Sequence, residues 1–235
     1  MKKLLCLCSL LAVLVLPVIA EACVIQYSVT VTAGSDVAVF QGTGVTDDLG
    51  YFECVLVDKL VDPAVLLGND DAAIESLVLK INSDPEVGVE FGLRAGGSAT
   101  TFSILSDVVT FSALVNPTAS ASAGVTLTDR NSNGAAITGL FGGKVHQARY
   151  NSSTVFADLV SDFSVGSGGT QTNSEAKPLS GSETITGTLT SIESEFNFIL
   201  SARDSASGTS TFVVIPEPAT IAILNLGGLL LRRKK

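Results

Sequence analysis

Apolar and polar residues alternate along most of the chain, and this alternation predicts β-strands. Strand-like segments lie at 24–34, 37–45, 51–61, 76–82, 87–97, 101–114, 124–129, 135–150, 182–192, 194–204 and 208–214. Each carries β-branched or aromatic residues at alternate positions and is bounded by turn-forming residues. About eleven short strands without a long amphipathic helix predict one all-β domain, an antiparallel β-sandwich or jelly roll.

Three segments depart from this alternation. In 152–163, apolar residues recur at the spacing of one helix face and Ser153 is suited to cap a helix, so we expect one short helix packed on a sheet. The apolar residues concerned are Val155, Phe156, Leu159 and Val160. Residues 70–77 fit either a helical turn or the start of a strand. Residues 164–182 lack both periodicity and bulk, which predicts a long surface loop.

The N-terminus has the organisation of a secretory signal peptide. Lys2 and Lys3 precede an apolar run at 4–16, Pro17 ends that run, and small residues allow cleavage after Ala20 or Ala22. The apolar run is shorter than the ~20 residues that a membrane span needs. Cys23 after a small residue leaves a lipoprotein open, although Glu21 fits a lipid-attachment site poorly. We expect a signal peptide at 1–22, removed by signal peptidase, and an exported domain at 23–215.

The uneven distribution of charge along the chain argues against nucleic acid as a partner. Six of the 14 basic residues lie at the two ends of the chain, and the region 23–215 holds 8 basic and 21 acidic residues, a net charge of −13. An acidic body without a basic stripe repels the phosphate backbone of nucleic acids. We therefore expect no nucleic-acid partner.

Two cysteines, Cys23 and Cys54, follow the predicted signal peptide. Export into an oxidising compartment allows a disulfide between them, and two unpaired cysteines are the alternative. A closed loop of about 30 residues would remove roughly 3 to 4 kcal/mol of unfolded-state entropy. The chain has no CxxC pair and one histidine, so the sequence offers no ligand set for zinc.

The segment Asp129 to Gly134, DRNSNG, matches the first half of a calcium-binding loop. Oxygen-bearing side chains at Asp129, Asn131 and Asn133 precede a glycine, a spacing that presents oxygens to a hard cation. The second half does not match, because Leu140 stands where a bidentate glutamate belongs. The alternative is a hairpin turn, since Asn and Gly adopt positive φ at little cost. Calcium is the one cofactor that the sequence suggests.

The sequence contains no convincing catalytic constellation, and we expect no enzyme. The only histidine, His146, lies in a strand-like segment and reads as structural, and no GxSxG nucleophile elbow is present. Paired carboxylates at Asp47-Asp48, Asp70-Asp71 and Glu193/Glu195 would suit glycoside hydrolysis. Sugar sites usually stack their ligand on aromatic rings, however, and this chain has no tryptophan and three tyrosines. Solvated loop acids on a secreted surface explain these pairs adequately.

The last 20 residues carry the strongest motif of the chain. Pro216, Glu217 and Pro218 precede an apolar stretch that contains Gly227-Gly228, and four cations end the chain: Arg232, Arg233, Lys234 and Lys235. This order resembles the PEP-CTERM sorting signal of exported proteins of Gram-negative bacteria. The apolar run from Ala219 to Leu231 gives about 20 Å of helix against a ~30 Å hydrocarbon core, so a transient processing signal suits it better than a durable anchor.

The resemblance implies a route and a partner. In that family an exosortase, a cysteine peptidase of the inner membrane, recognises the signal and is thought to cleave near Pro-Glu-Pro, and the carriers reach the cell surface or an exopolysaccharide matrix. We expect transient insertion in the inner membrane, oriented by the basic end, and a structural or adhesive role outside the cell. The alternatives are a secreted carbohydrate-binding or carbohydrate-cleaving β-sandwich module and a calcium-stiffened adhesin.

Overall fold

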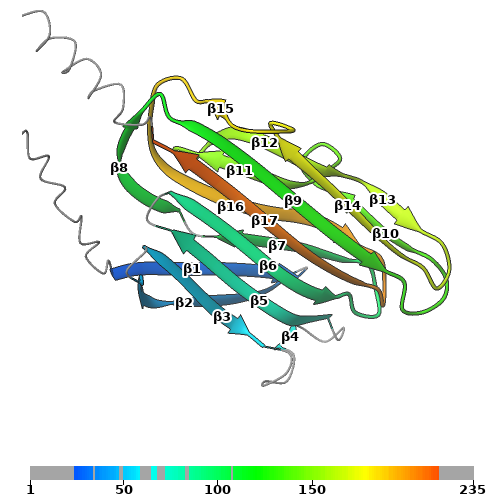
Figure 1. Ribbon diagram of the computed structural model, residues 1–235. Coiled ribbons are helices and arrows are strands. Elements are labelled where there is room, and N and C mark those ends of the chain that lie inside the picture. Colours follow the sequence, from blue (N-terminus) through cyan, green and yellow to red (C-terminus); the bar gives the residue numbers. More distant parts are fainter. Residues whose placement is uncertain are drawn as a thin grey trace, which may run out of the picture.

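The computed structural model describes residues 24–33, 35–47, 50–58, 65–67, 72–82, 85–106 and 108–216. These residues form two antiparallel sheets that pack face to face as a β-sandwich (Figure 1). The all-β, antiparallel prediction is therefore confirmed. The predicted signal peptide and the predicted sorting helix lie outside the described residues. Within the described ranges, no helix is long and apolar enough to span a membrane.

The first sheet, sheet A, has nine strands in which β16 is central. Its main order is β12-β11-β16-β7-β1-β2, with β8 and β10 also pairing with β16, and β13 pairing with β10. Its strands are β1 (Val24–Ala33), β2 (Asp36–Val45), β7 (Thr100–Ser106), β8 (Val109–Val115), β10 (Ala135–Gly139), β11 (Lys144–Tyr150), β12 (Thr154–Ser161), β13 (Phe163–Val165) and β16 (Thr188–Leu200).

The second sheet, sheet B, has eight strands, and the last strand of the described chain, β17, lies inside it. The main order is β14-β9-β17-β6-β5-β3, with β15 beside β9 and β4 beside β5. Its strands are β3 (Tyr51–Val57), β4 (Val65–Leu67), β5 (Ala72–Asn82), β6 (Glu86–Arg94), β9 (Thr118–Thr128), β14 (Thr170–Lys177), β15 (Glu183–Thr184) and β17 (Ser205–Ile215).

Phenylalanine rings join the two sheets. Phe91 of sheet B contacts Phe196 edge-on, with ring centroids 4.8 Å apart, and stacks on Phe198 at 5.8 Å. Phe156 of sheet A stacks on Phe212 of sheet B at 5.2 Å. Aliphatic side chains from alternate positions of both sheets fill the remaining interior. The predicted alternation therefore assigns the inner face of the regularly paired core strands.

The short helix predicted at 152–163 is wrong, because this segment forms β12 and β13. β12 carries an irregularity in its pairing with β11, where Ala148 faces Ala157 and Arg149 faces Val155, so Phe156 is the extra residue. Val160 adopts a positive φ of 63°. These two irregularities each place neighbouring residues in the core, at 156–157 and at 159–160. Buried positions spaced in this way imitate one face of a helix.

In two further segments, the secondary structure follows from pairing with neighbouring strands and not from the periodicity of the segment itself. The region 70–77 contributes to β5, where Ile74 and Leu77 are fully buried. The predicted loop at 164–182 is wrong in part, because residues 170–177 form the edge strand β14, paired along its whole length with β9. Most side chains of β14 remain exposed. A strand that buries so few side chains has no apolar alternation for the sequence to show.

Candidate functional site

Three neighbouring strands of sheet B present a flat outer surface of small, uncharged residues. The pairing of β14 with β9 and of β9 with β17 aligns their outward positions. We call this surface the hydroxyl face; it comprises Thr170, Thr172, Ser174 and Ala176 of β14, Ser120, Ser122, Gly124, Thr126 and Thr128 of β9, and Ser205, Ser207, Thr209 and Thr211 of β17.

Neighbouring hydroxyl groups on this face bond to each other across the strands. Thr126 Oγ1 lies 2.8 Å from Thr172 Oγ1, and Thr170 Oγ1 lies 3.2 Å from Thr128 Oγ1. Threonine pairs of this kind stabilise adjacent strands by a few tenths of a kcal/mol, up to about 1 kcal/mol. A hydroxyl group both donates and accepts, so each of these groups keeps further capacity toward solvent or a ligand.

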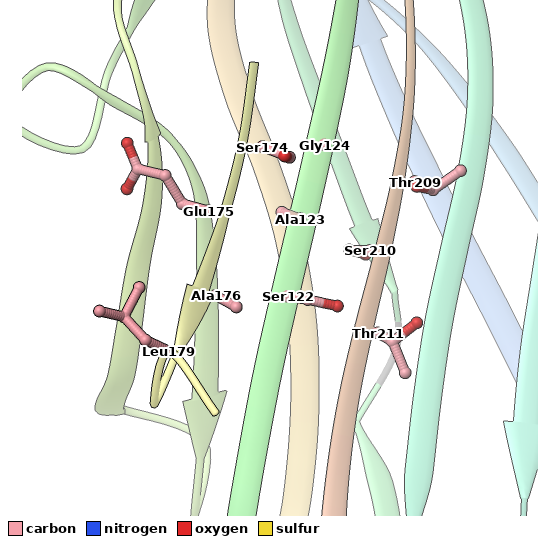
Figure 2. Close-up of a pocket in the computed structure, with 10 residues that line it drawn as sticks. All are labelled: Ser122, Ala123, Gly124, Ser174, Glu175, Ala176, Leu179, Thr209, Ser210 and Thr211. Atoms are coloured by element: carbon pink, nitrogen blue, oxygen red, sulfur yellow. The ribbon is translucent and has the colours of Figure 1, made fainter. Parts of the chain in front are cut away.

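The hydroxyl face is hollowed into a shallow depression of about 630 Å³ (Figure 2). Its floor is formed around Gly124, with Ser122 beside it on β9, Ser174 on β14 and Thr209 on β17. Leu179, which is 94% exposed, lines the same depression next to β14. A Cβ atom added at Gly124 would lie 3.6 Å from Ser174 Cβ, an ordinary contact. Packing therefore does not require glycine there, and its absent side chain leaves the surface hollow.

A second, smaller depression of about 240 Å³ lies on the same side of sheet B. Thr126, Thr128 and Ser207 line it together with Gly92 and Ser76. The two depressions are lined mainly by hydroxyl-bearing and small residues, and each has one carboxylate in its lining, Glu175 in the first and Glu75 in the second. Such a surface can hydrogen-bond to a hydroxyl-rich neutral molecule, but it lacks the aromatic platform on which sugar rings stack.

The predicted calcium loop connects β9 of sheet B to β10 of sheet A. The Asp129 carboxylate accepts four backbone N–H bonds: Asn131 and Ser132 donate to Oδ1, both at 3.0 Å, and Gly134 and Gly168 donate to Oδ2 at 3.0 Å and 2.6 Å. Burial disfavours the charged form, but these four donors outweigh it and lower the pKa of Asp129 to about 2. The loop joins two sheets and so is not a hairpin.

The donors around Asp129 favour a turn over a calcium site. A carboxylate has about four acceptor positions, and here N–H groups occupy all of them, pointing where a cation would bind. Asn131 is also engaged, because its Nδ2 donates to Ala202 O at 2.8 Å and its Oδ1 accepts from Asn133 N at 3.1 Å. Among the described residues there is no cluster of three or more His, Cys, Asp or Glu that could hold a metal. Calcium binding by Asp129, Asn131 and Asn133 stays a prediction.

His146 lies in β11, on the strand where the sequence places it, and is fully buried between the sheets. Its Nε2 lies 2.9 Å from Ser194 Oγ, which in turn lies 2.9 Å from Ser210 Oγ of sheet B. Nδ1 has no hydrogen-bond partner in the described structure. Burial lowers the pKa of His146 to about 3, so the ring is neutral at physiological pH.

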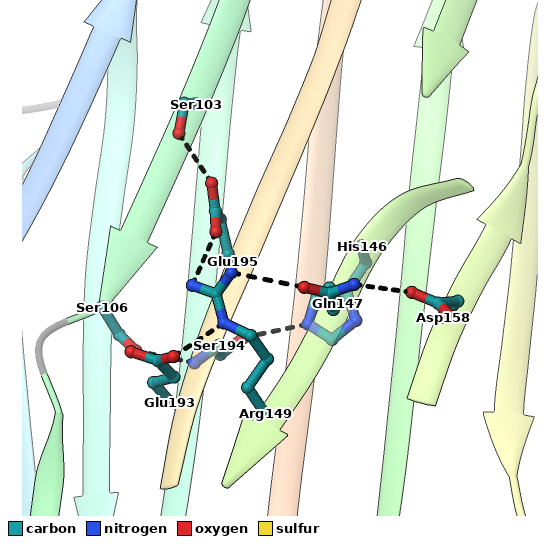
Figure 3. Close-up of polar contacts among 9 residues, drawn as sticks. All are labelled: Ser103, Ser106, His146, Gln147, Arg149, Asp158, Glu193, Ser194 and Glu195. Carbon is teal, nitrogen blue, oxygen red and sulfur yellow. Dashed lines mark hydrogen bonds and ion pairs between the residues drawn. The ribbon is translucent and has the colours of Figure 1, made fainter. Parts of the chain in front are cut away.

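The His146–Ser194 pair has the spacing of a base and a nucleophile but not the access (Figure 3). Both side chains have no exposed surface, and the Phe196 ring packs 4.7 Å from the imidazole. A substrate cannot reach an atom inside the sandwich core. The hydrogen-bonded series His146–Ser194–Ser210 therefore links the two sheets. The sequence could not reveal this link, because the three residues lie on β11, β16 and β17.

The predicted carboxylate pair Glu193/Glu195 is held by one arginine on the outer side of sheet A (Figure 3). Arg149 Nε lies 2.6 Å from Glu193 Oε1, and Arg149 Nη2 lies 2.7 Å from Glu195 Oε2. The side chains of Glu193 and Glu195 are 7% and 12% exposed. Ser103 also donates to Glu195. A carboxylate pair held in this way serves as a structural ion-pair cluster.

The remaining predicted residues fall at the borders of the described structure. Cys54 lies in β3, while Cys23 is outside the described residues, so the disulfide stays a prediction. Pro216 follows β17 directly and is exposed. Glu217, Pro218 and the four terminal cations, Arg232, Arg233, Lys234 and Lys235, lie outside the described residues.

Comparison with known proteins adds two weak structural similarities. No protein-family model matches the chain, and no curated protein matches it. The chain is similar to a structure of the infectious bursal disease virus Gx strain, with 14% identity and a TM-score of 0.28, and to one of the Gt strain, with 11% identity and a TM-score of 0.26. The match covers 84% of this chain in both cases, and 57% and 66% of the viral chains, less than two thirds of each. These scores carry no argument about function.

Proposed function

We propose that this chain is a bacterial protein exported through its N-terminal signal peptide, sorted and cleaved through its C-terminal PEP-CTERM signal, and active as a structural or adhesive component of the cell surface or exopolysaccharide matrix. The observation that carries the proposal is the order of Pro216-Glu217-Pro218, an apolar run and a basic end. An exosortase-type peptidase is the proposed partner for this segment. Calcium is not required.

The position of the last strand supports cleavage near Pro216. β17 ends at Ile215, which pairs with Thr118 of β9, and Pro216 follows with an exposed side chain. Proline cannot donate a hydrogen bond to a continued strand. A cut at or after this residue would leave every pair of β17 with β6 and β9 intact. The sandwich can thus lose its tail without losing a strand.

The contacts of four candidate groups support a non-catalytic role. The His146–Ser194 pair is buried away from solvent, and Glu193 and Glu195 are both bound by Arg149. The Asp129 carboxylate holds a turn. Each of these groups has a structural partner, which suits a passive β-domain.

Mass determination of both ends of the protein recovered outside the cell tests this proposal. We expect a mature chain that begins at Glu21 or Cys23, after cleavage behind Ala20 or Ala22, and ends near Pro216–Pro218. Replacing Pro216, Glu217 and Pro218 by alanine should leave an uncleaved precursor in the inner membrane, because the apolar run and cations still arrest the chain. Neutral residues at 232–235 serve as the contrasting variant, since they weaken arrest and orientation instead. Intact Lys235 on secreted wild-type protein would overturn the sorting proposal.

The hydroxyl face favours a second candidate, a carbohydrate-binding module without an aromatic platform. Gly124→Leu would fill the depression, and the open contact at this position predicts that the variant folds. We expect such a module to lose binding to a neutral glycan on an array when Gly124 is replaced. Gly97→Leu is the matched control, because a Cβ atom there meets nothing within 4 Å and Gly97 does not line the depression. Absence of glycan binding by the wild-type protein would remove this candidate.

A further inference from the structure

We propose that β2 is an interface strand through which two copies of this chain join edge to edge, so that sheet A continues from one subunit into the other across a two-fold axis. The proposal is independent of the sorting route. It rests on how β2 differs from the other sheet edges and on the self-complementary order of its residues.

The opposite side of the sandwich is closed by contacts between its two edge strands. Lys144 of sheet A pairs with Glu175 of β14 at 2.6 Å, and Ser161 N of β12 donates to the same glutamate at 3.0 Å. Lys177 of β14 donates to Phe156 O of β12 at 2.7 Å. β12 is also irregular where Phe156 is inserted. Irregularity and charge of this kind protect an edge from further strand pairing.

β3, the other edge of sheet B, is protected in a similar way. Its pairing with β5 shifts register between Val55 and Val57. Glu53 stands on this edge strand, with its carboxylate 3.9 Å from Lys80 Nζ. A second chain approaching β3 would meet an interrupted ladder and a charge. The edges at β12, β14 and β3 therefore carry features that oppose pairing.

β2 has regular pairing, and its one charged residue, Asp36, stands at its first position. Its ten residues pair with β1 in an unbroken register from Val24↔Val45 to Ala33↔Asp36. Residues 37–45 contain no charged residue and no proline, and β1 is the one strand that pairs with β2 within the described ranges. Val37, Val39 and Val45 on its outer side are 57%, 55% and 60% exposed. A long, regular, apolar edge is a template for another strand.

The residue order of β2 fits a second copy of itself. Antiparallel pairing about a two-fold axis at Gln41 places Val37 opposite the partner's Val45 and Val39 opposite the partner's Thr43 on the outer side. On the inner side it places Phe40 opposite the partner's Gly42, so that a large ring faces a residue without a side chain. In this register, outward side chains of one copy lie beside outward side chains of the other, and inward side chains lie beside inward ones, as in a continuous sheet. A homodimer is therefore the occupant to which we commit.

The charges at the ends of this register predict how the association depends on salt. Asp36 lies at one end of β2 and stands next to the partner's Asp47 in the proposed pairing. Each subunit body also carries a net charge of −13. Association at β2 should therefore strengthen when salt is raised, because screening reduces repulsion between carboxylates while leaving the apolar contact in place.

Site-directed crosslinking of the full chain in producing cells tests the proposal. In Gln41→Cys the two introduced thiols face each other at the axis, with Cβ atoms about 5 Å apart, within reach of a short bis-maleimide. Val115→Cys is the matched control, because Val115 is also an exposed residue of sheet A, on β8. The wild-type chain reports any background from its own cysteines. Mass spectrometry of the linked peptides identifies the residues joined.

We expect a crosslinked dimer joined at residue 41 for Gln41→Cys, stronger at higher salt, and no such product for Val115→Cys. Adding Val39→Lys to Gln41→Cys replaces the apolar side chain opposite the partner's Thr43 by a charged one and should reduce the product, while Val115→Lys should leave it unchanged. The proposal is overturned if Gln41→Cys stays monomeric, as it would if another segment of the same chain covers β2. A product whose yield Val39→Lys does not reduce, or that joins residue 41 to a different protein, overturns it as well.

Discussion

Acidification should weaken this sandwich through one buried side chain, His146. In the folded protein its pKa is about 3, against 6.5 for an exposed histidine. Between these two values the unfolded chain binds a proton that the folded protein does not. Stability is therefore fully present above pH 6.5 and is lost as the pH falls toward 3. Taking the pH from 7 to 5 should cost about 2 kcal/mol of unfolding free energy from this group alone.

His146→Gln isolates this contribution, because glutamine keeps a polar group toward Ser194 and does not titrate. We would measure urea unfolding by circular dichroism at several pH values between 7 and 5, since the chain has no tryptophan for fluorescence. The carboxylates titrate equally in both proteins and cancel in the difference. Wild type should lose about 2 kcal/mol more than the variant over this range. Parallel curves for the two proteins would refute the assignment of a neutral, buried imidazole.

Four further predictions concern Arg149, the Asp129 loop and the two cysteines of the mature chain. Arg149→Met should lower the unfolding free energy by about 3 kcal/mol, because it leaves two largely buried carboxylates unpaired, and adding Glu193→Gln with Glu195→Gln should restore most of it in the same urea assay. Asp129→Asn should lower the melting temperature at neutral pH, and the melting temperature of this variant should fall less on acidification than that of the wild type. The reason is that the pKa of Asp129 is lowered from 3.8 to about 2 in the folded protein, so this carboxylate contributes stability that is fully present above pH 3.8 and is lost as the pH falls through 2. Equal wild-type melting curves with calcium and with chelator are expected from the saturated Asp129 carboxylate, and a rise with calcium would favour the metal site instead. If Cys23 and Cys54 are joined, the denatured exported protein should show no alkylatable thiol until a reductant is added, and two reactive thiols would exclude the disulfide.

The sequence predicts the inner face of most strands because alternation survives wherever pairing is regular. In β9, for example, Ala121, Val125 and Leu127 point inward between serines and threonines. The prediction fails where the backbone is irregular, as at Phe156 and Val160 of β12. It also fails for β14, whose side chains mostly face water, so that pairing with β9 rather than burial defines the strand.

The hydroxyl face cannot be predicted from local sequence pattern alone. Thr-x-Thr triplets at 126–128, 170–172 and 209–211 are visible in the sequence, and a spacing of two places both threonines of a triplet on one side of a strand. These triplets lie side by side because the strand order is β14-β9-β17, and this order brings together segments that are far apart in the sequence. The buried contact of His146 with Ser194 depends on strand order in the same way.

The two central strands, β16 and β17, are the last two of the described chain, and this order constrains when the protein can fold. Before β17 is available, sheet B consists of two separate parts, β14-β9 on one side and β6-β5-β3 on the other. Before β16 is available, β11 and β7 likewise have no strand between them in sheet A. A growing or translocating chain therefore carries four unsatisfied inner edges until its final segment emerges. The sandwich closes late and as a unit, and a chain arrested before residue 188 has no complete sheet to form.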